Sequence, residues 1–366
     1  MFEQLNLFDI EITPMFPSTR YQGSKLKYVD WIWECVKDLP FNSVLDAFGG
    51  TGCIAYKMKK EGKCVTYNDI LSFNSMIGRA LVENDTVKVS DDVVQYVLTR
   101  HSDIQYPSFI ADTFSDIYYT NEENNWLDFV VTNIRSIQDK YQQAILYFAL
   151  FQACIIKRPY NLFHRKNLYI RLQEVERSFG NKATWDTPFE EHFKTFVKEA
   201  NNAVFSNGKH NQSINQDACT ISNHFDFVYV DTPYISSNGI GVNYADFYHF
   251  LEGLMDYEHW SEKIDYSSKH RRLKAVPSEW TNPKTITTAF EKLIHNFKDS
   301  ILAISYRSDG IPSVETIIDI LENEGKNVKV YESQKMKYVL SNKTSSEILI
   351  QAVNWQNQAL AHQQDG

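Results

Sequence analysis

The sequence predicts an α/β fold with a central, mostly parallel β-sheet and a mainly helical segment inserted into it. Between residues 44 and 83, strand-like and helix-like patterns alternate, as they do in the βαβα units that build parallel sheets. From about residue 90 to 215 the apolar spacing is helical, aromatic residues are frequent, and we find no convincing strand-like run. Compact apolar runs return after residue 226 and complete the predicted sheet.

The individual elements follow from the spacing of apolar residues and from turn residues. Helical spacing is clearest in the long stretch 126–156 and in the shorter segments 52–61 and 71–83. The predicted strands are 44–48, 64–68, 227–230, 301–305, 328–331 and 348–353.

These patterns divide the chain into an N-terminal arm (1–18), a sheet domain in two pieces (19–90 and 216–366) and a helical insert (91–215). The whole chain has a net charge of −9, yet residues 157–182 hold seven Lys and Arg against two acids. Such asymmetry is typical of a protein that turns one face to a polyanion. A second basic cluster consists of Lys269, His270, Arg271, Arg272 and Lys274.

Composition narrows the class of protein. No apolar stretch is long enough to span a bilayer, and the N-terminus lacks the basic and apolar regions of a secretory signal. The five cysteines are scattered and never form a C-x-x-C pair, which argues against a disulfide framework and a structural zinc site. The histidines have no ligand spacing either. We therefore expect a cytoplasmic protein that binds no metal.

A glycine-rich turn, Asp46-Ala47-Phe48-Gly49-Gly50-Thr51-Gly52, follows the first predicted strand. Glycines let a ligand approach the backbone, and a helix N-terminus comes next. The second strand ends in Asn68-Asp69, where a carboxylate can accept hydrogen bonds from ribose hydroxyls. The glycines are closer together than in G-x-G-x-x-G, and Asp46 suits a cationic amino acid group better than a pyrophosphate. An ordinary structural turn is the alternative.

The segment Arg20-Tyr21-Gln22-Gly23-Ser24-Lys25 precedes a helix predicted to start near Leu26. Lys25 can meet a ligand carboxylate there, and Tyr21 can pack on the ligand. A surface lysine beside a capping Ser24 is the alternative interpretation.

The segment Asp231-Thr232-Pro233-Tyr234 follows the apolar strand 227–230. A carboxylate at the mouth of a buried strand is costly unless it is used or paired. Across a turn fixed by Pro233, Tyr234 offers a stacking surface beside that acceptor, which suits a flat base carrying an amino group. A simple strand-to-loop turn with a capping Asp is the alternative.

In their order along the chain, these segments resemble the motifs of the Dam-like N6-adenine DNA methyltransferases of the alpha group. RYQGSK resembles the N-terminal cofactor motif of that family, DAFGGTG its glycine-rich motif, Asn68-Asp69 its ribose motif and DTPY its catalytic D-P-P-Y motif. The family places its target-recognition region between the glycine-rich and catalytic motifs, where this chain has its basic helical insert. The resemblance covers residues 20 to about 312 and implies a Rossmann-like methyltransferase fold.

The resemblance implies S-adenosylmethionine as the cofactor. Asp46 would then meet its ammonium, Asp69 its ribose, and Tyr21 and Lys25 its methionine carboxylate. Asp217 would face the cofactor adenine, with an ordinary surface loop as the alternative. The expected cofactor-binding residues are Tyr21, Lys25, Asp46, Phe48, Gly50, Asp69 and Asp217.

The resemblance also implies site-specific methylation of adenine N6 in double-stranded DNA, as the modification enzyme of a restriction–modification system. The target base would flip out of the duplex, stack on Tyr234 and donate N–H bonds to Asp231 and to the carbonyl of Thr232. Thr232 departs from the proline of the family, but every residue keeps that carbonyl, and Pro233 is retained. The expected DNA contacts are Lys157, Arg158, Arg165, Lys166 and Arg171.

Two other functions stay open at this point: methylation of RNA adenine or of cytosine N4, and a DNA-binding subunit without catalysis. Asp231 and the order of the motifs favour adenine in DNA, and the intact Asp231, Pro233 and Tyr234 speak against lost catalysis. The expected partners are double-stranded DNA and a cognate restriction endonuclease, and we expect a monomer.

Overall fold

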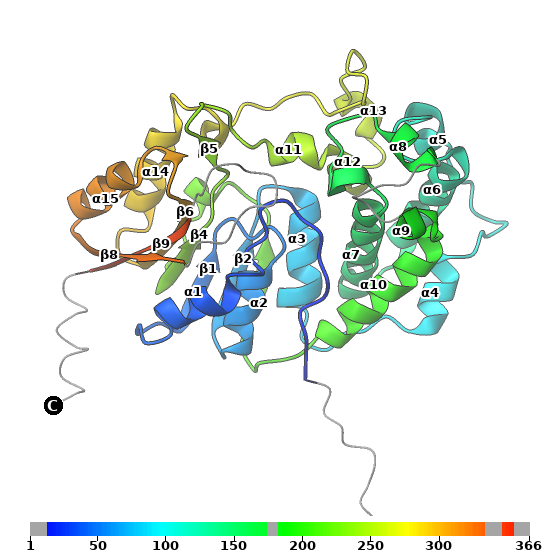
Figure 1. The fold of residues 1–366 in the computed structure, drawn as a ribbon. Helices are drawn as coiled ribbons and strands as arrows, with labels where there is room; N and C mark the ends of the chain where they lie inside the picture. The colour runs from blue at the N-terminus through cyan, green and yellow to red at the C-terminus, as the bar shows by residue number, and fades with distance from the viewer. Residues whose placement is uncertain (1–12, 174–181, 334–345, 355–366) are drawn as a thin grey trace, which may run out of the picture.

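The structure, a computed structural model, describes residues 13–173, 182–333 and 346–354. Residues 1–12 of the predicted arm, and Arg177 of the basic segment, lie outside these ranges. A sheet body and a helical body lie side by side (Figure 1).

A seven-stranded sheet in the order β3-β2-β1-β4-β6-β9-β8 forms the sheet body. β9 is antiparallel to both of its neighbours, and the other pairings are parallel. This confirms the predicted Rossmann-like, mostly parallel α/β sheet. The chain builds β1, β2 and β3 outward in one direction and then crosses to β4 on the other side of β1. Its strands are β1 (Ser43–Asp46), β2 (Cys64–Asn68), β3 (Gln212–Ile214), β4 (Phe227–Val230), β6 (Ile301–Arg307), β8 (Lys326–Glu332) and β9 (Glu347–Asn354).

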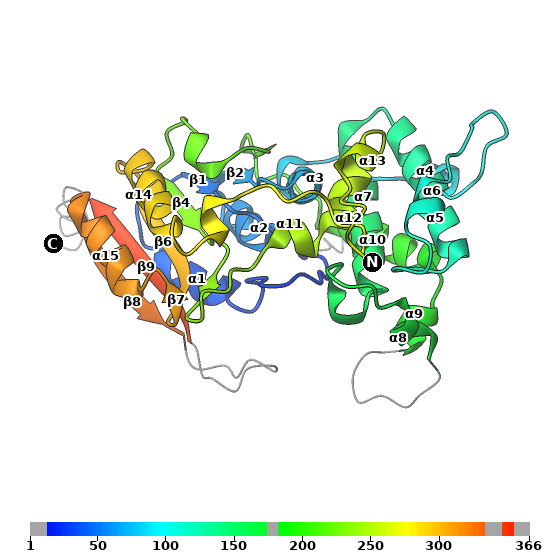
Figure 2. The same cartoon turned by 90° about the horizontal axis from the view of Figure 1, so that it is seen from above.

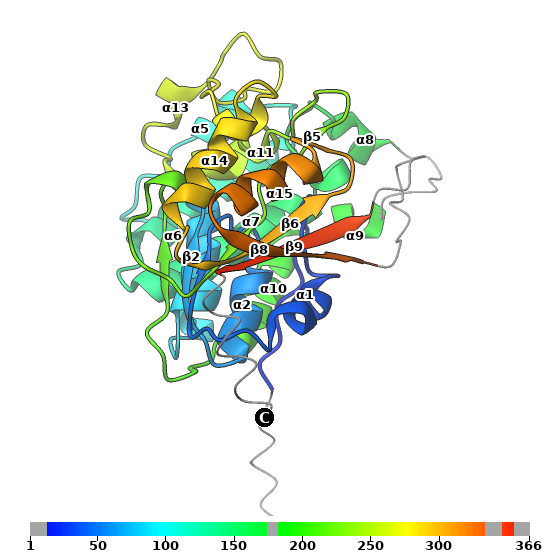
Figure 3. The same ribbon diagram turned by 90° about the vertical axis from the view of Figure 1, so that its left-hand side faces the viewer.

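Helices cover both faces of the sheet (Figure 3). On one face lie α1 (Val29–Val36) and α2 (Cys53–Lys60), and on the other α14 (Ile286–Asn296) and α15 (Val314–Asn323). In β1, Val44 packs with the first pair and Leu45 with the second, because successive side chains of a strand point to opposite faces. Burial on both faces explains why the strands are continuous apolar runs rather than alternating ones.

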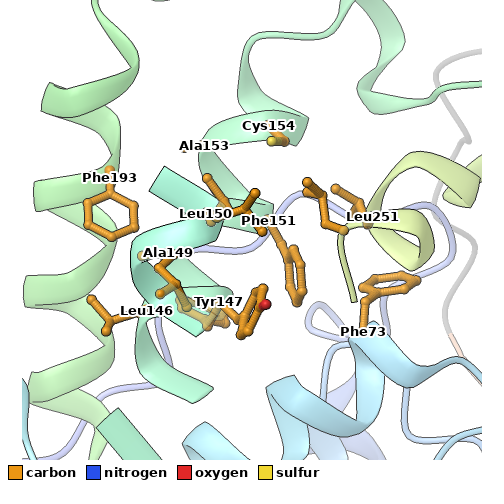
Figure 4. Close-up of a cluster of buried hydrophobic side chains, with 14 of the residues drawn as sticks. Phe73, Leu146, Tyr147, Ala149, Leu150, Phe151, Ala153, Cys154, Phe193 and Leu251 are labelled. Atoms are coloured by element: carbon orange, nitrogen blue, oxygen red, sulfur yellow. The ribbon is translucent and has the colours of Figure 1, made fainter. Parts of the chain in front are cut away.

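The helical body is built around α7, whose side chains from Ala144 to Ile155 are all buried. Figure 4 shows α7 between Phe193 of α10, Leu251 of α12 and Phe73 of α3 (Ser72–Gly78). One cluster of buried apolar residues joins these helices, so the two bodies share a core. The helices of the body are α4 (Asp91–Val97), α5 (Phe109–Thr113), α6 (Asn121–Ser136), α7 (Lys140–Ile156), α8 (Leu168–Leu172), α9 (Lys182–Asp186), α10 (Phe189–Ala203), α11 (Tyr244–Phe247), α12 (His249–Met255) and α13 (Trp260–Lys263).

The boundary between the two bodies differs from the prediction at both ends. β3 (Gln212–Ile214) falls inside the segment assigned to the helical insert, yet it pairs with β2 in the central sheet. Its three residues are too short and too polar to form a recognisable apolar run. Conversely, Tyr248, Leu251 and Trp260 belong to the half assigned to the sheet domain but pack into the core of the helical body.

Two helix boundaries also shift. The predicted helix 126–156 is two helices, α6 and α7, separated where Asp139 accepts hydrogen bonds from the first backbone N–H groups of α7. α1 begins at Val29 rather than near Leu26, and Ser24 makes no cap hydrogen bond to it.

From α13 the chain returns to α14 in a long connection on the side of the molecule where α11 lies (Figure 2). None of the helices in the described ranges combines the length and the apolar character needed to cross a bilayer. The described side chains also contain no cluster of three or more His, Cys, Asp or Glu arranged to hold a metal ion.

Candidate functional site

A pocket opens at the carboxyl ends of β1, β2 and β4. It lies where the strand order reverses, which is the place where open α/β sheets bind ligands. Segments far apart in the sequence meet there. Of the predicted site residues, the lining includes Tyr21, Lys25, Asp46, Phe48, Gly50, Asp69, Asp231 and Pro233.

The glycine-rich turn takes a conformation that requires glycine. Gly50 and Gly52 have φ angles of 50° and 76°, and a Cβ on Gly49 would overlap the ring of Tyr67. The hydroxyl of Tyr67 donates a 2.7 Å hydrogen bond to the carbonyl of Gly50. The end of β2 therefore holds the turn in place and keeps its backbone open toward the pocket.

Asp46 is a buried carboxylate, 1% exposed, at the floor of the pocket. Its Oδ2 accepts a hydrogen bond from the backbone N–H of Ala55, whereas Oδ1 has no partner among the described residues. Burial and the nearby charge of Asp231 raise the pKa of Asp46 to about 8. A buried acceptor without a partner fits a cationic ligand group, which would both satisfy Oδ1 and favour the charged form.

Asp69 ties the second strand to the same turn. Its Oδ2 accepts hydrogen bonds from the backbone N–H of Gly50 and the side-chain amide of Asn74, and Oδ1 accepts one from the backbone N–H of Leu71. Burial outweighs these hydrogen bonds and raises the pKa of Asp69 to about 6. The carboxylate of Asp69 thus lines the pocket and also holds the neighbouring backbone in place through these hydrogen bonds.

Tyr21 forms the aromatic wall of the pocket. Its ring stacks between Tyr244 and Tyr248, with ring centroids 5.6 Å and 4.5 Å away. Its hydroxyl accepts a hydrogen bond from Asn74. Tyr244 and Tyr248 could not be recognised as site residues from the sequence, because nothing in their spacing separates them from the many other aromatic side chains of the helical body.

Lys25 is 5% exposed and lies inside a cluster of oxygen acceptors. Its Nζ is 2.6 Å from the hydroxyl of Tyr234, 2.9 Å from Asp231 Oδ1 and 3.1 Å from Glu347 Oε1. Burial alone would lower the pKa of Lys25, but the two carboxylates outweigh burial and raise it. The three N–H donors of the ammonium match these three oxygens, so Lys25 pairs with protein carboxylates rather than holding a donor ready for a ligand carboxylate, as the sequence analysis expected.

Asp231 stands at the mouth of β4, and its described bonds all involve Oδ1. That oxygen accepts a hydrogen bond from Tyr234 at 2.7 Å and pairs with Lys25, and no described group bonds Oδ2. Thr232 is 2% exposed. Tyr306, at the end of β6, packs edge-on against the ring of Tyr234 with centroids 5.8 Å apart. The segment is thus held on one side, and one carboxylate oxygen is left for a ligand.

The chain beyond Tyr234 is fixed by a small second sheet. β5 (Ile235–Ser236) pairs antiparallel with β7 (Gly310–Ile311). This pairing anchors the turn that carries Asp231 and Tyr234 to the segment that follows β6.

A protein-family model described as D12 class N6 adenine-specific DNA methyltransferase matches residues 21–318. The chain belongs to this family. The match begins at Tyr21 and runs through the glycine-rich turn and the Asp231 segment, so it contains every strand that forms the pocket. The methyltransferase therefore acts on adenine N6 in DNA, and S-adenosylmethionine is its methyl donor.

Curated relatives agree with this membership. The methyltransferase is 29% identical to the type II methyltransferase M2.HphI of Haemophilus parahaemolyticus, over 87% of its own chain and 92% of that protein. It is 22% identical to the type II methyltransferase M.FokI of Planomicrobium okeanokoites, of which it spans 51%. Among solved structures, a magnesium protoporphyrin IX methyltransferase from Synechocystis PCC 6803 with bound SAM is 9% identical, with a TM-score of 0.30 and coverage of 89% of this chain and 76% of that one.

The residues of the pocket fit that cofactor. The partnerless Oδ1 of Asp46 is suited to the ammonium of the methionine part, and the bare glycine turn leaves room for a ligand beside it. Asp217 does not join them. It is exposed, caps a short 3-10 turn by accepting a hydrogen bond from the N–H of Cys219, and is absent from the pocket lining.

Three of the five side chains expected to contact DNA are buried, which corrects the prediction for Lys157, Arg158 and Arg171. Arg171 makes a two-point ion pair with Glu123 at 2.6 and 2.9 Å, and Lys157 pairs with the same carboxylate at 3.0 Å. These cations stabilise the interior of the helical body and are not available to a phosphate. Sequence cannot distinguish them, since a buried cation with a partner and a surface cation look alike as letters.

Arg158 is the deepest of the three, at 1% exposure. Its guanidinium donates to the carbonyls of Tyr118 and Leu162 and lies over the ring of Tyr118. Arg165 and Lys166, in contrast, are exposed, together with Tyr169. Of the five predicted contacts, only Arg165 and Lys166 remain candidates.

Proposed function

We propose that this enzyme methylates N6 of one adenine within a specific DNA sequence, as the modification methyltransferase of a type II system. Family membership supports the reaction class, and the names of the curated relatives support the type II setting. The observation that carries the assignment to this site is the meeting of Asp46, Asp69 and Asp231 in one pocket.

The proposed chemistry uses Asp231 and the carbonyl of Thr232 as acceptors for the two N–H bonds of an extruded adenine. The N6 lone pair is delocalised into the ring, and two acceptors localise it toward the methyl group. When S-adenosylmethionine is bound, it supplies a methyl carbon activated by a sulfonium. Asp231 stabilises the positive charge that develops on nitrogen, through the Oδ2 that has no described partner.

Tyr234 is proposed as the surface on which the extruded base stacks. Its hydroxyl is fixed by Lys25 and Asp231, and its ring is supported by Tyr306. Because the hydroxyl and the ring are both held already, little conformational entropy is lost when a base stacks on Tyr234.

The proposed cofactor contacts are Asp46 with the ammonium and Asp69 with the ribose, with Tyr21, Phe48 and Gly50 lining the pocket. On the DNA side, Arg165 and Lys166 are proposed as phosphate contacts because both are exposed on the helical body. The assignment of Asp217 to the cofactor adenine has no support from its position.

DNA as the substrate follows from the family, and its double-stranded form is part of the proposal. A cognate restriction endonuclease, a cytoplasmic location and a monomeric state belong to the proposal. Light scattering of the purified protein checks the last of these, with a mass near 42.6 kDa expected.

The test is sequencing that detects modified bases in DNA from cells that express the chain. We expect N6-methyladenine at one short motif, and its loss with Asp231→Ala. Asp319→Ala is the matched control, because Asp319 is an exposed carboxylate on α15. N4-methylcytosine, or unchanged N6-methyladenine in Asp231→Ala, would contradict the assignment.

A further inference from the structure

Another buried carboxylate lies close to Asp231, on a strand that no motif of the sequence marks. Glu347 begins β9 and is 1% exposed. Its Oε1 is 3.1 Å from Nζ of Lys25 and 3.3 Å from the hydroxyl of Tyr234. Its Oε2 is buried and has no hydrogen-bond partner among the described residues.

If Glu347 served only to stabilise the fold, this arrangement would be an unfavourable one. A buried carboxylate with one oxygen unsatisfied loses solvation that its partners do not fully restore, and an apolar residue would pack there at lower cost. Burial raises the pKa of Glu347, Lys25 opposes that rise, and Asp231 adds to it. An unfavourable group that contacts Lys25 and Tyr234, the two side chains that bond Asp231, points to a role in the reaction centre.

The effect of Glu347 on Asp231 follows from the charges of the three side chains in this cluster. Lys25 is one cation shared by two carboxylates, Asp231 and Glu347. If Glu347 were neutral, the full field of Lys25 would act on Asp231 and weaken it as an acceptor. The hydroxyls of Tyr229 and Tyr244 also face this cluster, and burial raises their pKa values, so they stay uncharged. Asp46 faces Asp231 as well, and burial together with the charge of Asp231 raises its pKa.

We propose that Glu347 is a positioning residue for methyl transfer: it shares the charge of Lys25 and anchors Lys25 and the hydroxyl of Tyr234, so that Asp231 stays a strong acceptor for the target amino group. The proposal rests on the role proposed above for Asp231. Glu347 is not itself part of the described pocket lining and touches no reacting atom in this scheme; it acts through Lys25, which does line the pocket.

The test is Glu347→Gln, which keeps the shape and the acceptor but removes the charge. Single-turnover transfer of radiolabelled methyl from S-adenosylmethionine to unmethylated plasmid DNA gives the rate of chemistry. We expect the rate to fall at least about tenfold, while cofactor affinity and the KM for DNA change by less than about twofold. Glu347→Asp should recover part of the loss, and Glu332→Gln, an exposed carboxylate on β8, should change nothing.

A double-mutant cycle with Lys25→Met separates this role from general packing. Since Glu347 acts through Lys25, adding Glu347→Gln to Lys25→Met should change the rate by less than about twofold. A wild-type rate in Glu347→Gln, an equal loss in both backgrounds, or a loss matched by a lower melting temperature would overturn the inference. If the unaltered enzyme transfers no methyl to DNA, the proposed function fails instead.

Discussion

The backbone N–H of Ala55 donates a hydrogen bond to one oxygen of Asp46, and the other oxygen of that carboxylate is buried with no partner in the described part of the chain. The geometry gives Asp46 two opposing effects. It is costly in the empty protein and favourable once a cation binds beside it.

Asp46→Asn should therefore weaken cofactor binding but stabilise the empty protein. An acid whose folded pKa, here about 8, lies above its unfolded value costs stability as pH rises between the two values. At pH 7 this cost is present, and the neutral amide removes it. We expect a melting temperature roughly 1–3 °C higher without ligand and an affinity for S-adenosylmethionine at least about thirtyfold lower, from thermal melts and calorimetry. Asp319→Asn serves as the control, and a melting temperature that falls would contradict the argument.

Cofactor binding should release protons below pH 8. Asp46 is mostly protonated at pH 7 because its pKa is about 8, and the ammonium binds its ionised form. Affinity should therefore rise between pH 6 and 7.5. Calorimetry at pH 7 in two buffers of different ionisation enthalpy should show nearly one proton released per site, and Asp46→Asn should show almost none. Equal heats in both buffers for the unaltered enzyme would exclude this linkage.

Arg171→Met should destabilise the helical body without removing any exposed cation. It leaves Glu123, which also pairs with Lys157, without its two-point partner. Removing one member of a buried ion pair costs about 3 kcal/mol or more, and urea denaturation measures the loss. A variant with unchanged stability and weaker DNA binding would show that the original surface assignment was right.

Arg165→Ala combined with Lys166→Ala should do the opposite. Both side chains are exposed, so the melting temperature should stay within about 1 °C. If both contact phosphates, the slope of log affinity against log salt should become shallower by roughly 1.8. The exposed pair Lys182 and Lys194, replaced by alanine, gives a control for charge alone.

Leu150→Ala should lower the stability of both bodies together. Leu150 is fully buried in the cluster that joins α3, α7 and α12, where Phe151 also packs edge-on against Phe73 (Figure 4). We expect a loss of about 2–5 kcal/mol and a single unfolding transition followed by both fluorescence and circular dichroism. Leu172→Ala, at an exposed site, should cost far less. Two separate transitions would mean that the shared core is not cooperative.

The sequence was most informative where chemistry and burial leave local traces. Strands buried on both faces are apolar runs, and turns that need glycine show glycine, so β1, β4 and the turn at Gly49 and Gly50 could be predicted. β3 could not be predicted, because the residues Gln212–Ile214 form a strand only through their pairing with β2.

Within the site, the missed residues are those whose role depends on distant partners. Glu347 lies 116 positions after Asp231, and only the pairing of β9 with β6 brings the two together. Lys25 lines the pocket, but its described partners are Asp231 and Glu347 rather than the ligand carboxylate that was predicted, because sequence does not show which carboxylates will surround it. Arg158 was predicted to contact DNA, but its side chain is buried, and the sequence does not show that burial.

The helical body takes its material from two stretches of the chain, one before β3 and one after β5. In a chimaeric protein that replaces only the first stretch, α12 would pack against an α7 from another protein. The buried side chains of the two stretches would then no longer match. A replacement of the helical body therefore has to exchange both stretches together.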